Sequence, residues 1–185
     1  MNQSQENLLK AITGESIARN KYTFFAKQAT KEDQIWIARV FEETADNERA
    51  HAEEEYEKIK NKVEMTNTYN IHQIGTTLEN LRTAQDGEKY EWATMYPDFE
   101  KIARDEGEKE IADLFKEISE VEEKHMERYK ILADLLEKDS LYKTQKPIEW
   151  KCLNCGYIHK GTSAPKKCPL CKKPQGWYMG LGIVR

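Results

Sequence analysis

Apolar residues recur at steps of three and four through four long stretches of the chain, the spacing that places side chains on one face of an α-helix. The first stretch covers residues 4–30, and the second runs from a cap at Thr30 and Asp33 to about residue 62. The third spans roughly residues 75–104, and the fourth follows Gly107 to about residue 138. We therefore predict four helices that pack through their apolar stripes into a bundle.

Three segments interrupt this pattern. Residues 63–74 lack periodicity, and twelve extended residues reach roughly 40 Å, enough to pass along a whole helix as a crossover between two helical hairpins. Pro97 lies inside the third stretch and removes a backbone donor, so we expect a bend there. Residues 139–150 are predicted to form a linker, after which the composition changes.

Glutamates and histidines occupy positions inside the apolar stripes. Each helix contributes one Glu, and in two helices a His follows three residues later on the same face. These residues are Glu15, Glu48, His51, Glu88, Glu122 and His125. One Glu from each of two helices and a Glu-x-x-His pair from each of the others is the ligand set of a two-metal carboxylate site. Buried, uncompensated carboxylates are costly, so we interpret the set as a dimetal centre rather than a solvated acidic face.

Glu91 breaks the symmetry of the repeat, because it lies one turn beyond Glu88 and has no counterpart in the first helix. One interpretation is that Glu91 is a solvated residue on the helix surface. As a ligand it would give one metal a spare carboxylate, so that this metal changes ligands as it changes charge. Tyr22 and Tyr96 are expected to donate hydrogen bonds to ligand carboxylates, with core packing as the alternative role.

All four cysteines follow residue 150 as two Cys-x-x-Cys pairs. They are Cys152, Cys155, Cys168 and Cys171. Reduced thiolates at this spacing converge tetrahedrally on a metal, either zinc in a structural ribbon or iron in a one-electron carrier. A module of about 40 residues rich in Gly, Pro and Lys needs such a metal to hold it together.

The charge of the chain divides near the same place. Residues 146–185 hold eight Lys/Arg and one acidic residue, a net charge of +7, which leaves −11 for residues 1–145 and −4 for the whole 185-residue chain. We predict two domains, 1–145 and 146–185. An acidic bundle repels a phosphate backbone, so no nucleic-acid partner is expected. Without a long apolar run or a secretory signal, we expect no membrane partner and a cytoplasmic location.

The ligand order, two local sequences and the cysteine module together resemble the rubrerythrin family over essentially the whole chain. The local sequences are Glu15-Ser-Ile-Ala-Arg-Asn-Lys-Tyr22 and Gly87-Glu88-Lys-Tyr-Glu91-Trp92, and the cysteine surroundings resemble rubredoxin. The resemblance implies a mainly α fold, a ferritin-like four-helix bundle with a long crossover connection, followed by a small rubredoxin-like domain of strands and loops. It also implies two Fe ions in a diiron-oxo site and one Fe ion in the four-cysteine site.

The same resemblance assigns roles to individual residues. His51 becomes the residue that exchanges with Glu91 when iron is reduced, which makes these two the expected catalytic residues. The cysteines Cys152, Cys155, Cys168 and Cys171 become ligands of the mononuclear iron. The diiron ligands become Glu15, Glu48, Glu88, Glu91, Glu122 and His125.

The activity implied by the resemblance is reduction of hydrogen peroxide to water in oxidative-stress defence. Electrons would reach the diiron site from the four-cysteine iron, which an upstream reductase or rubredoxin would reduce. Subunits would pair head to tail as a homodimer or larger homo-oligomer, an arrangement that suits the opposite charges of the two parts. Two other classes remain open at this point: a ferritin-like iron oxidation and storage protein, and a zinc-ribbon structural or adaptor protein.

Overall fold

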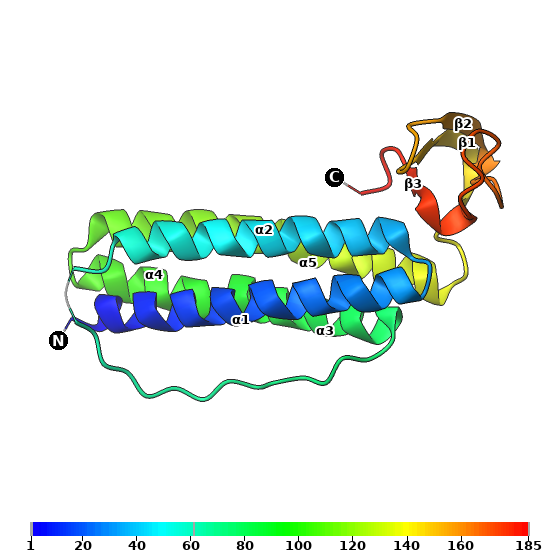
Figure 1. The fold of residues 1–185 in the computed structure, drawn as a ribbon. Helices are drawn as coiled ribbons and strands as arrows, with labels where there is room; N and C mark the ends of the chain where they lie inside the picture. The colour runs from blue at the N-terminus through cyan, green and yellow to red at the C-terminus, as the bar shows by residue number, and fades with distance from the viewer. Residues whose placement is uncertain (1, 61, 185) are drawn as a thin grey trace.

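The computed structural model describes residues 2–60 and 62–184, and helices fill most of that length (Figure 1). The helical elements in chain order are α1 (Gln3–Lys31), α2 (Ile35–Glu57), α3 (Thr77–Tyr90), a π-helical turn (Glu91–Met95), α4 (Tyr96–Asp105) and α5 (Lys109–Glu137). The π-helical turn joins α3 to α4, so the four expected helices are present, the third of them in three pieces. Within the two described ranges, no helix is both long and apolar enough to cross a membrane.

The connection from α2 to α3 is the long crossover that the sequence predicts. Residues 62–76 form neither helix nor strand, and they pass outside the bundle from one end to the other (Figure 1). Because of this return, α2 and α3 run in the same direction. The crossover ends in a capping box, in which the Thr76 side chain accepts from Glu79 N–H and the Glu79 carboxylate accepts from Thr76 N–H.

The expected cap of the second helix at Thr30 and Asp33 is wrong. The Thr30 hydroxyl donates to the Ala26 carbonyl and stays within the last turn of α1. Asp33 takes a left-handed conformation with φ of 57° in the turn, and Gln34 precedes α2 without a capping side-chain bond. A short polar side chain that tolerates positive φ therefore makes the turn, instead of starting the helix.

An irregular turn lies directly before Pro97, where we expected a bend. Tyr96 N–H donates to the Glu91 carbonyl five residues earlier, so residues 91–95 form a π-helix. Beyond this extra residue the buried face shifts by one position. Regular α-helical spacing from Glu88 predicts that Ile102, fourteen residues later, is buried on the same face. In the structure Tyr96 and Ala103 are fully buried, whereas Ile102 is only half-buried. π-helical turns inside α-helices are frequent at functional sites.

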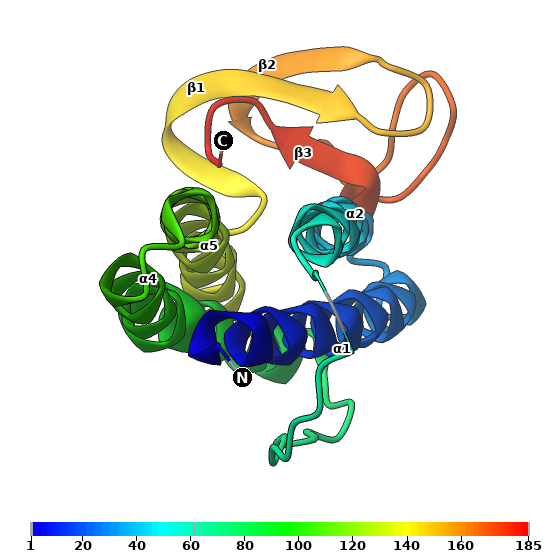
Figure 2. The ribbon, with the colours of Figure 1, turned by 90° about the vertical axis from the view of Figure 1, so that its left-hand side faces the viewer.

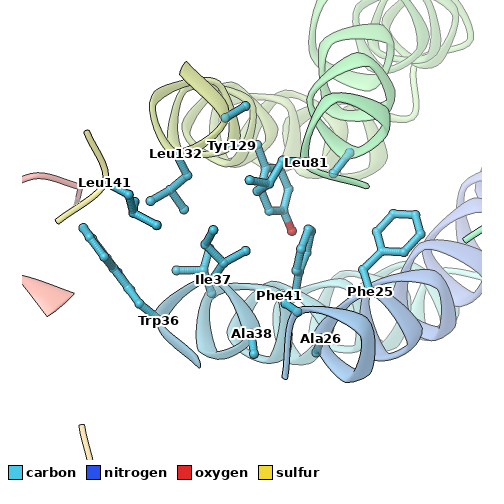
Figure 3. Packing of buried hydrophobic residues seen from close by; sticks show 14 of the residues in the cluster. Phe25, Ala26, Trp36, Ile37, Ala38, Phe41, Leu81, Tyr129, Leu132 and Leu141 are labelled. Carbon is cyan, nitrogen blue, oxygen red and sulfur yellow. The ribbon is translucent and has the colours of Figure 1, made fainter. Parts of the chain in front are cut away.

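Two apolar clusters fill the bundle on either side of the stripe glutamates. Aromatic rings dominate the first cluster (Figure 3), where the Phe41 centroid lies 5.2 Å from that of Tyr129 and 5.5 Å from that of Phe25. Such tilted and edge-on contacts are the geometry that aromatic pairs prefer. The second cluster contains Leu8, Ala11, Tyr96, Ala103, Ile111, Ala112, Phe115 and Ile118. In α1, in the segment α3–α4 and in α5 the glutamate therefore lies between one apolar cluster and the other, whereas the core residues of α2 belong to the first cluster.

The C-terminal module is a three-stranded antiparallel sheet in the order β2-β1-β3. The strands are β1 (Lys143–Cys152), β2 (Ile158–Ser163) and β3 (Tyr178–Gly180). The expected linker over residues 139–150 is thus too long, because β1 begins at Lys143 and pairs with β2. The division of the chain into domains 1–145 and 146–185 stays a prediction.

The module packs on the bundle end that carries the α1–α2 turn, and Figure 2 shows its strands beside α2 and α5. The Tyr142 hydroxyl donates to Gln34 Oε1 at 2.8 Å, and Trp36 of α2 belongs to the same buried cluster as Trp150 of β1. Gly176 approaches the turn so closely that a Cβ there would lie 1.5 Å from the Asp33 carbonyl oxygen. Only glycine fits this contact.

Gly176→Ala is therefore expected to displace the module from the bundle and to lower the free energy of unfolding by about 1–3 kcal/mol, the usual cost of overpacking. Thermal unfolding of the metal-loaded protein measures the loss, and proteolysis around residues 138–143 measures the displacement. Gly14→Ala is the control, since a Cβ at this position in α1 meets nothing within 4 Å. Equal behaviour of the two variants would contradict the contact.

Candidate metal centre

The four helices bring together two overlapping groups of possible metal ligands. The first group is Glu15, Glu48, His51 and Glu122, and the second is Glu48, Glu88, Glu122 and His125. Within each group, one ligand atom from every residue lies within 4.8 Å of the others. Glu48 and Glu122 belong to both groups, so each has the position of a carboxylate that bridges two cations.

The histidine contacts show how the two bridging glutamates are oriented. His51 Nδ1 lies 2.9 Å from Glu122 Oε1 and 3.2 Å from Glu48 Oε2. His125 Nδ1 lies 2.7 Å from Glu122 Oε2 and 3.4 Å from Glu48 Oε1. Each glutamate therefore turns one oxygen toward each histidine. The two imidazole rings are nearly stacked, with centroids 6.0 Å apart, and both direct Nδ1 inward.

Unpartnered oxygens test whether the site fits cations. One carboxylate oxygen of each of Glu15, Glu48, Glu88 and Glu122 is buried without a well-aligned hydrogen bond, and these side chains are at most 1% exposed. The oxygens of Glu48, Glu88 and Glu122 face a histidine Nδ1 at 2.9–3.5 Å. A buried polar atom without a partner is costly, and a cation is the partner that removes the cost of several carboxylates at once. Carboxylate and imidazole together suit iron, manganese or zinc. The donor set therefore fits a pair of such ions.

Two buried tyrosines hold the terminal glutamates from outside. The Tyr22 hydroxyl donates to Glu88 Oε1, and the Tyr96 hydroxyl donates to Glu15 Oε1. Both tyrosines are fully buried, and each belongs to a different apolar cluster. The two ends of the site are thus built alike, with a phenol oriented by packing and bonded to a carboxylate.

Glu91 lies at the margin of this arrangement. It begins the π-helical turn, it is half-buried, and neither ligand group described above includes it. The group that contains Glu15 is completed by His51 instead. The side chains therefore have the arrangement in which the histidine, rather than Glu91, supplies the fourth ligand.

Glu55 is a buried residue of the site region that the sequence pattern missed. Stripe positions recur in the second helix from Ala45 through Ala52 to Tyr56, which predicts that Tyr56 is buried. In the structure Tyr56 is 70% exposed and Glu55 is 0% exposed. Its Oε1 lies 3.0 Å from the Tyr96 hydroxyl oxygen. The signal that could have found it is spacing, since Glu55 follows Glu48 by seven residues, two helical turns on the same face.

Burial and mutual repulsion set the protonation of the metal-free site. Burial, with the charges of Glu48 and Glu122, raises the pKa of Glu88 to about 8. Burial disfavours charge on the histidines, but hydrogen bonds to Glu122 and Glu48 outweigh it and raise the pKa of His51 to about 10 and that of His125 to about 12. Without cations, the site therefore retains protons as substitute positive charge.

The four cysteines form a separate site in the module. Their Sγ atoms all lie within 4.8 Å of one another, with Cys152 3.6 Å from Cys171 and Cys155 3.7 Å from Cys168. The residue after each pair, Gly156 and Lys172, has a positive φ of 76° and 65°. In these turns backbone N–H groups are directed at the sulfurs. Burial alone would raise the pKa of the Cys168 thiol, but hydrogen bonds to its sulfur outweigh the effect of burial and lower the pKa to about 6. Four converging sulfurs fit a tetrahedral metal.

Comparison with known proteins agrees with this pair of sites. The family model described as "Rubrerythrin" matches residues 6–133, and the one described as "Rubrerythrin, rubredoxin-like domain" matches residues 150–178. The chain belongs to the rubrerythrin family. Similar relatives include a rubrerythrin of Porphyromonas gingivalis, 43% identical over 176 residues, which are 95% of this chain and 88% of the relative. A rubrerythrin of Nitratidesulfovibrio vulgaris is 38% identical over 181 residues, 97% of this chain and 95% of the relative.

Solved structures place the rubrerythrin fold among ferritin-like bundles. Nigerythrin in its fully reduced, all-ferrous state matches with a TM-score of 0.66 and 33% identity, over 96% of this chain and 86% of that one. Bacterioferritin of Mycobacterium tuberculosis matches with a TM-score of 0.67 but 18% identity, over 75% and 88% of the chains, and so shows the fold alone. The predicted fold class is confirmed. Rubrerythrin and rubredoxin-like domains together imply an iron-binding protein of the oxidoreductase type.

The protonation of the site gives a pH prediction for the metal-free protein. Glu88, His51 and His125 have higher pKa values folded than unfolded, so the folded chain binds more protons from about pH 5 to pH 10. The free energy of unfolding therefore falls as the pH rises through this range, by about 1.4 kcal/mol per pH unit for each additional proton bound.

Thermal unfolding of the apoprotein in a buffer series checks this prediction. The iron-loaded protein is the control, since metal replaces the protons and its affinity increases with pH. An apoprotein that becomes more stable toward pH 9 would show that the site is not proton-loaded.

Proposed function

We propose that this chain is a diiron peroxidase that reduces hydrogen peroxide to water with electrons delivered through its four-cysteine iron. The observation that carries the proposal is the presence of both sites in one chain, a buried carboxylate and histidine centre and a separate four-sulfur centre. Each turnover consumes one hydrogen peroxide, two electrons and two protons, and yields two water molecules. A two-electron centre with its own one-electron carrier matches that stoichiometry.

The two ligand groups define which residues would hold the ions. One Fe ion would be held by Glu15, Glu48, His51 and Glu122, a second by Glu48, Glu88, Glu122 and His125, and a third by the four cysteines. When bound, the iron pair supplies two electrons at one place, and the thiolate-held iron restores them one at a time.

The protein's own contribution at the bundle site is orientation and exclusion of water. The Tyr22 and Tyr96 hydroxyls hold Glu88 and Glu15, while the bridging pair Glu48 and Glu122 keeps its oxygens turned toward both histidines. The apolar clusters close the bundle above and below these side chains. Access from solvent is left to the side where His51 and Glu91 are partly exposed.

Glu91 and His51 are proposed to exchange as ligands of one ion. Oxidation adds positive charge, and an anionic carboxylate compensates that charge better than a neutral imidazole does. Glu91 is half-buried beside the site and lies in a π-helical turn, whose backbone is not held to regular α geometry. His51 supports the proposal as a member of the group that contains Glu15, Glu48 and Glu122.

Electron delivery favours a head-to-tail pair of subunits. The module contacts its own bundle at Asp33, and α2 rises about 1.5 Å per residue, which places Glu48 roughly 22 Å from that contact. Electron transfer is slow over such a distance, so a module from a second copy is the better donor. The charge of +7 on residues 146–185 and of −11 on residues 1–145 supports docking between copies. A flavoprotein reductase or another rubredoxin would reduce the module, in a cytoplasm that keeps its thiols reduced.

The two competing functions make different demands on the molecule. Iron storage needs a hollow cage of many subunits and has no use for an attached one-electron carrier, so a native mass of two or four chains separates the proposals. A zinc-ribbon adaptor would be colourless. Metal analysis with a visible spectrum distinguishes it from an iron protein.

Rapid mixing tests the peroxidase proposal. The iron-loaded protein is reduced without oxygen, and the ferric-thiolate colour is followed after addition of hydrogen peroxide or dioxygen at equal concentration. Peroxide is expected to restore the colour at least about tenfold faster, a difference of about 1.4 kcal/mol in activation free energy. Equal rates with the two oxidants would count decisively against the proposal.

Glu91→Ala tests the ligand exchange. The variant should keep its fold, since Glu91 lies outside the ligand groups, but its turnover with peroxide should fall by about 10–100-fold because the oxidised ion loses its compensating carboxylate. Steady-state peroxidase kinetics provide the measurement. Glu120→Ala, which removes an exposed carboxylate from α5, is the matched control. Unchanged kinetics in Glu91→Ala would refute the exchange.

A further inference from the structure

Glu55 is a fully buried carboxyl group that neither ligand group uses. It lies on α2, its Oε1 is 3.0 Å from Tyr96 Oη, and its Oε2 has no hydrogen-bond partner. Among residues 2–60 and 62–184, no Lys, Arg or His makes an ion pair with it. A lone buried carboxylate would be costly, so this group requires an explanation.

The Tyr96 hydroxyl lies between two carboxyl groups but carries a single proton. On one side it contacts Glu15, and on the other it contacts Glu55. An ionised carboxylate can only accept hydrogen bonds, and a Glu15 that binds a metal is ionised. The phenol proton is therefore directed at Glu15, which leaves the contact between Tyr96 and Glu55 without a proton unless Glu55 supplies one.

We infer that Glu55 is a protonated carboxylic acid that donates its hydrogen bond to Tyr96 Oη and thereby commits the Tyr96 proton to Glu15. Glu55 is thus a positioning residue, which acts on the metal centre through Tyr96 and, among the described residues, has no hydrogen bond to a proposed metal ligand. The inference rests on the proposed dimetal centre, because an ionised Glu15 is part of it. It does not depend on the peroxidase activity.

The electrostatic surroundings agree with a neutral Glu55. Burial raises the pKa of its carboxyl group well above the ordinary value, and the charges of Glu122 and Glu48 act in the same direction. The hydrogen bond with Tyr96 and the charge of His51 oppose the shift without cancelling it.

The end of the site at Tyr22 and Glu88 has no counterpart of Glu55 among the described residues. The Tyr22 hydroxyl bonds to Glu88, but among the described residues no second carboxyl group lies within hydrogen-bond distance of it. Glu55 therefore acts only on the side of Glu15 and His51, where the proposed ligand exchange takes place. A Glu15 held in one orientation would keep that ion attached while its other ligand changes.

Two substitutions separate a positioning role from simple packing. In Glu55→Gln the side-chain amide still donates to Tyr96 Oη, whereas Glu55→Leu fills the space and donates nothing. Glu54→Gln is the control, because Glu54 is the exposed neighbour on the same helix. Tyr96→Phe removes the hydroxyl between Glu55 and Glu15, so adding Glu55→Leu to this variant should not change the iron affinity further.

Infrared spectroscopy and anaerobic ferrous-iron titration provide the readouts. The iron-loaded wild type and Glu54→Gln should show the carbonyl-stretch band of a protonated carboxylic acid, which Glu55→Gln and Glu55→Leu lack. Iron affinity should fall by about 10–100-fold in Glu55→Leu and stay near wild type in Glu55→Gln.

Three results would overturn the inference. They are a wild-type band that survives both substitutions of Glu55, an iron affinity that Glu55→Leu leaves unchanged, and an affinity loss in Glu55→Gln as large as that in Glu55→Leu. If Glu55→Leu fails to fold, the carbonyl-stretch band and the iron affinity of Glu55→Gln still test the inference. Neither readout requires turnover, so a failure of the peroxidase proposal would leave this test intact.

Discussion

Burial of carboxylates at the centre of the bundle is the constraint on which the rest of the structure depends. Four glutamates are almost completely buried, and each has an oxygen without a well-aligned hydrogen bond from the protein: Glu15, Glu48, Glu88 and Glu122. Apolar packing holds them there, since α1, the segment α3–α4 and α5 carry core residues on both sides of their glutamates, and α2 carries them on one side of Glu48. The fold therefore stabilises an arrangement that is unfavourable until cations bind, a common relation between stability and function.

Periodicity predicted the elements of the fold because the bundle's buried faces are regular over most of their length. Four helices, a crossover over residues 63–74 and the placement of the two Glu-x-x-His pairs all follow from spacing alone. The cysteine module could be recognised because its ligands are close in sequence. The start of β1 could not, since Lys143 pairs with Ser163, a partner twenty residues away.

The misses within the third helical stretch and α2 share a physical cause, which is a local departure from ideal helical spacing. The π-helical turn shifts the buried face by one residue, so Tyr96 and Ala103 take places that a continuous α-helix gives to Met95 and Ile102. On α2, the stripe turns slightly and buries Glu55 in place of Tyr56. A charged residue at such a position resembles a surface residue in the sequence. Only the contact with Tyr96 reveals its surroundings.

The aromatic cluster next to Tyr22 has a mechanical consequence. The Tyr22 ring is packed against Phe25, Phe41 and Tyr129, with centroids 5.5 to 6.2 Å away. Glu88 is therefore hydrogen-bonded to a hydroxyl whose ring is held in place by packing. One turn beyond Glu88, the backbone at Glu91 departs from regular α-helical geometry. Tyr96 is likewise packed against Phe99 and Phe115 and bonded to Glu15, so both terminal glutamates are fixed while the backbone at Glu91 is irregular. Under the proposed exchange, the change of ligand would be confined to Glu91 and His51, and the bundle would compensate a change of charge without opening.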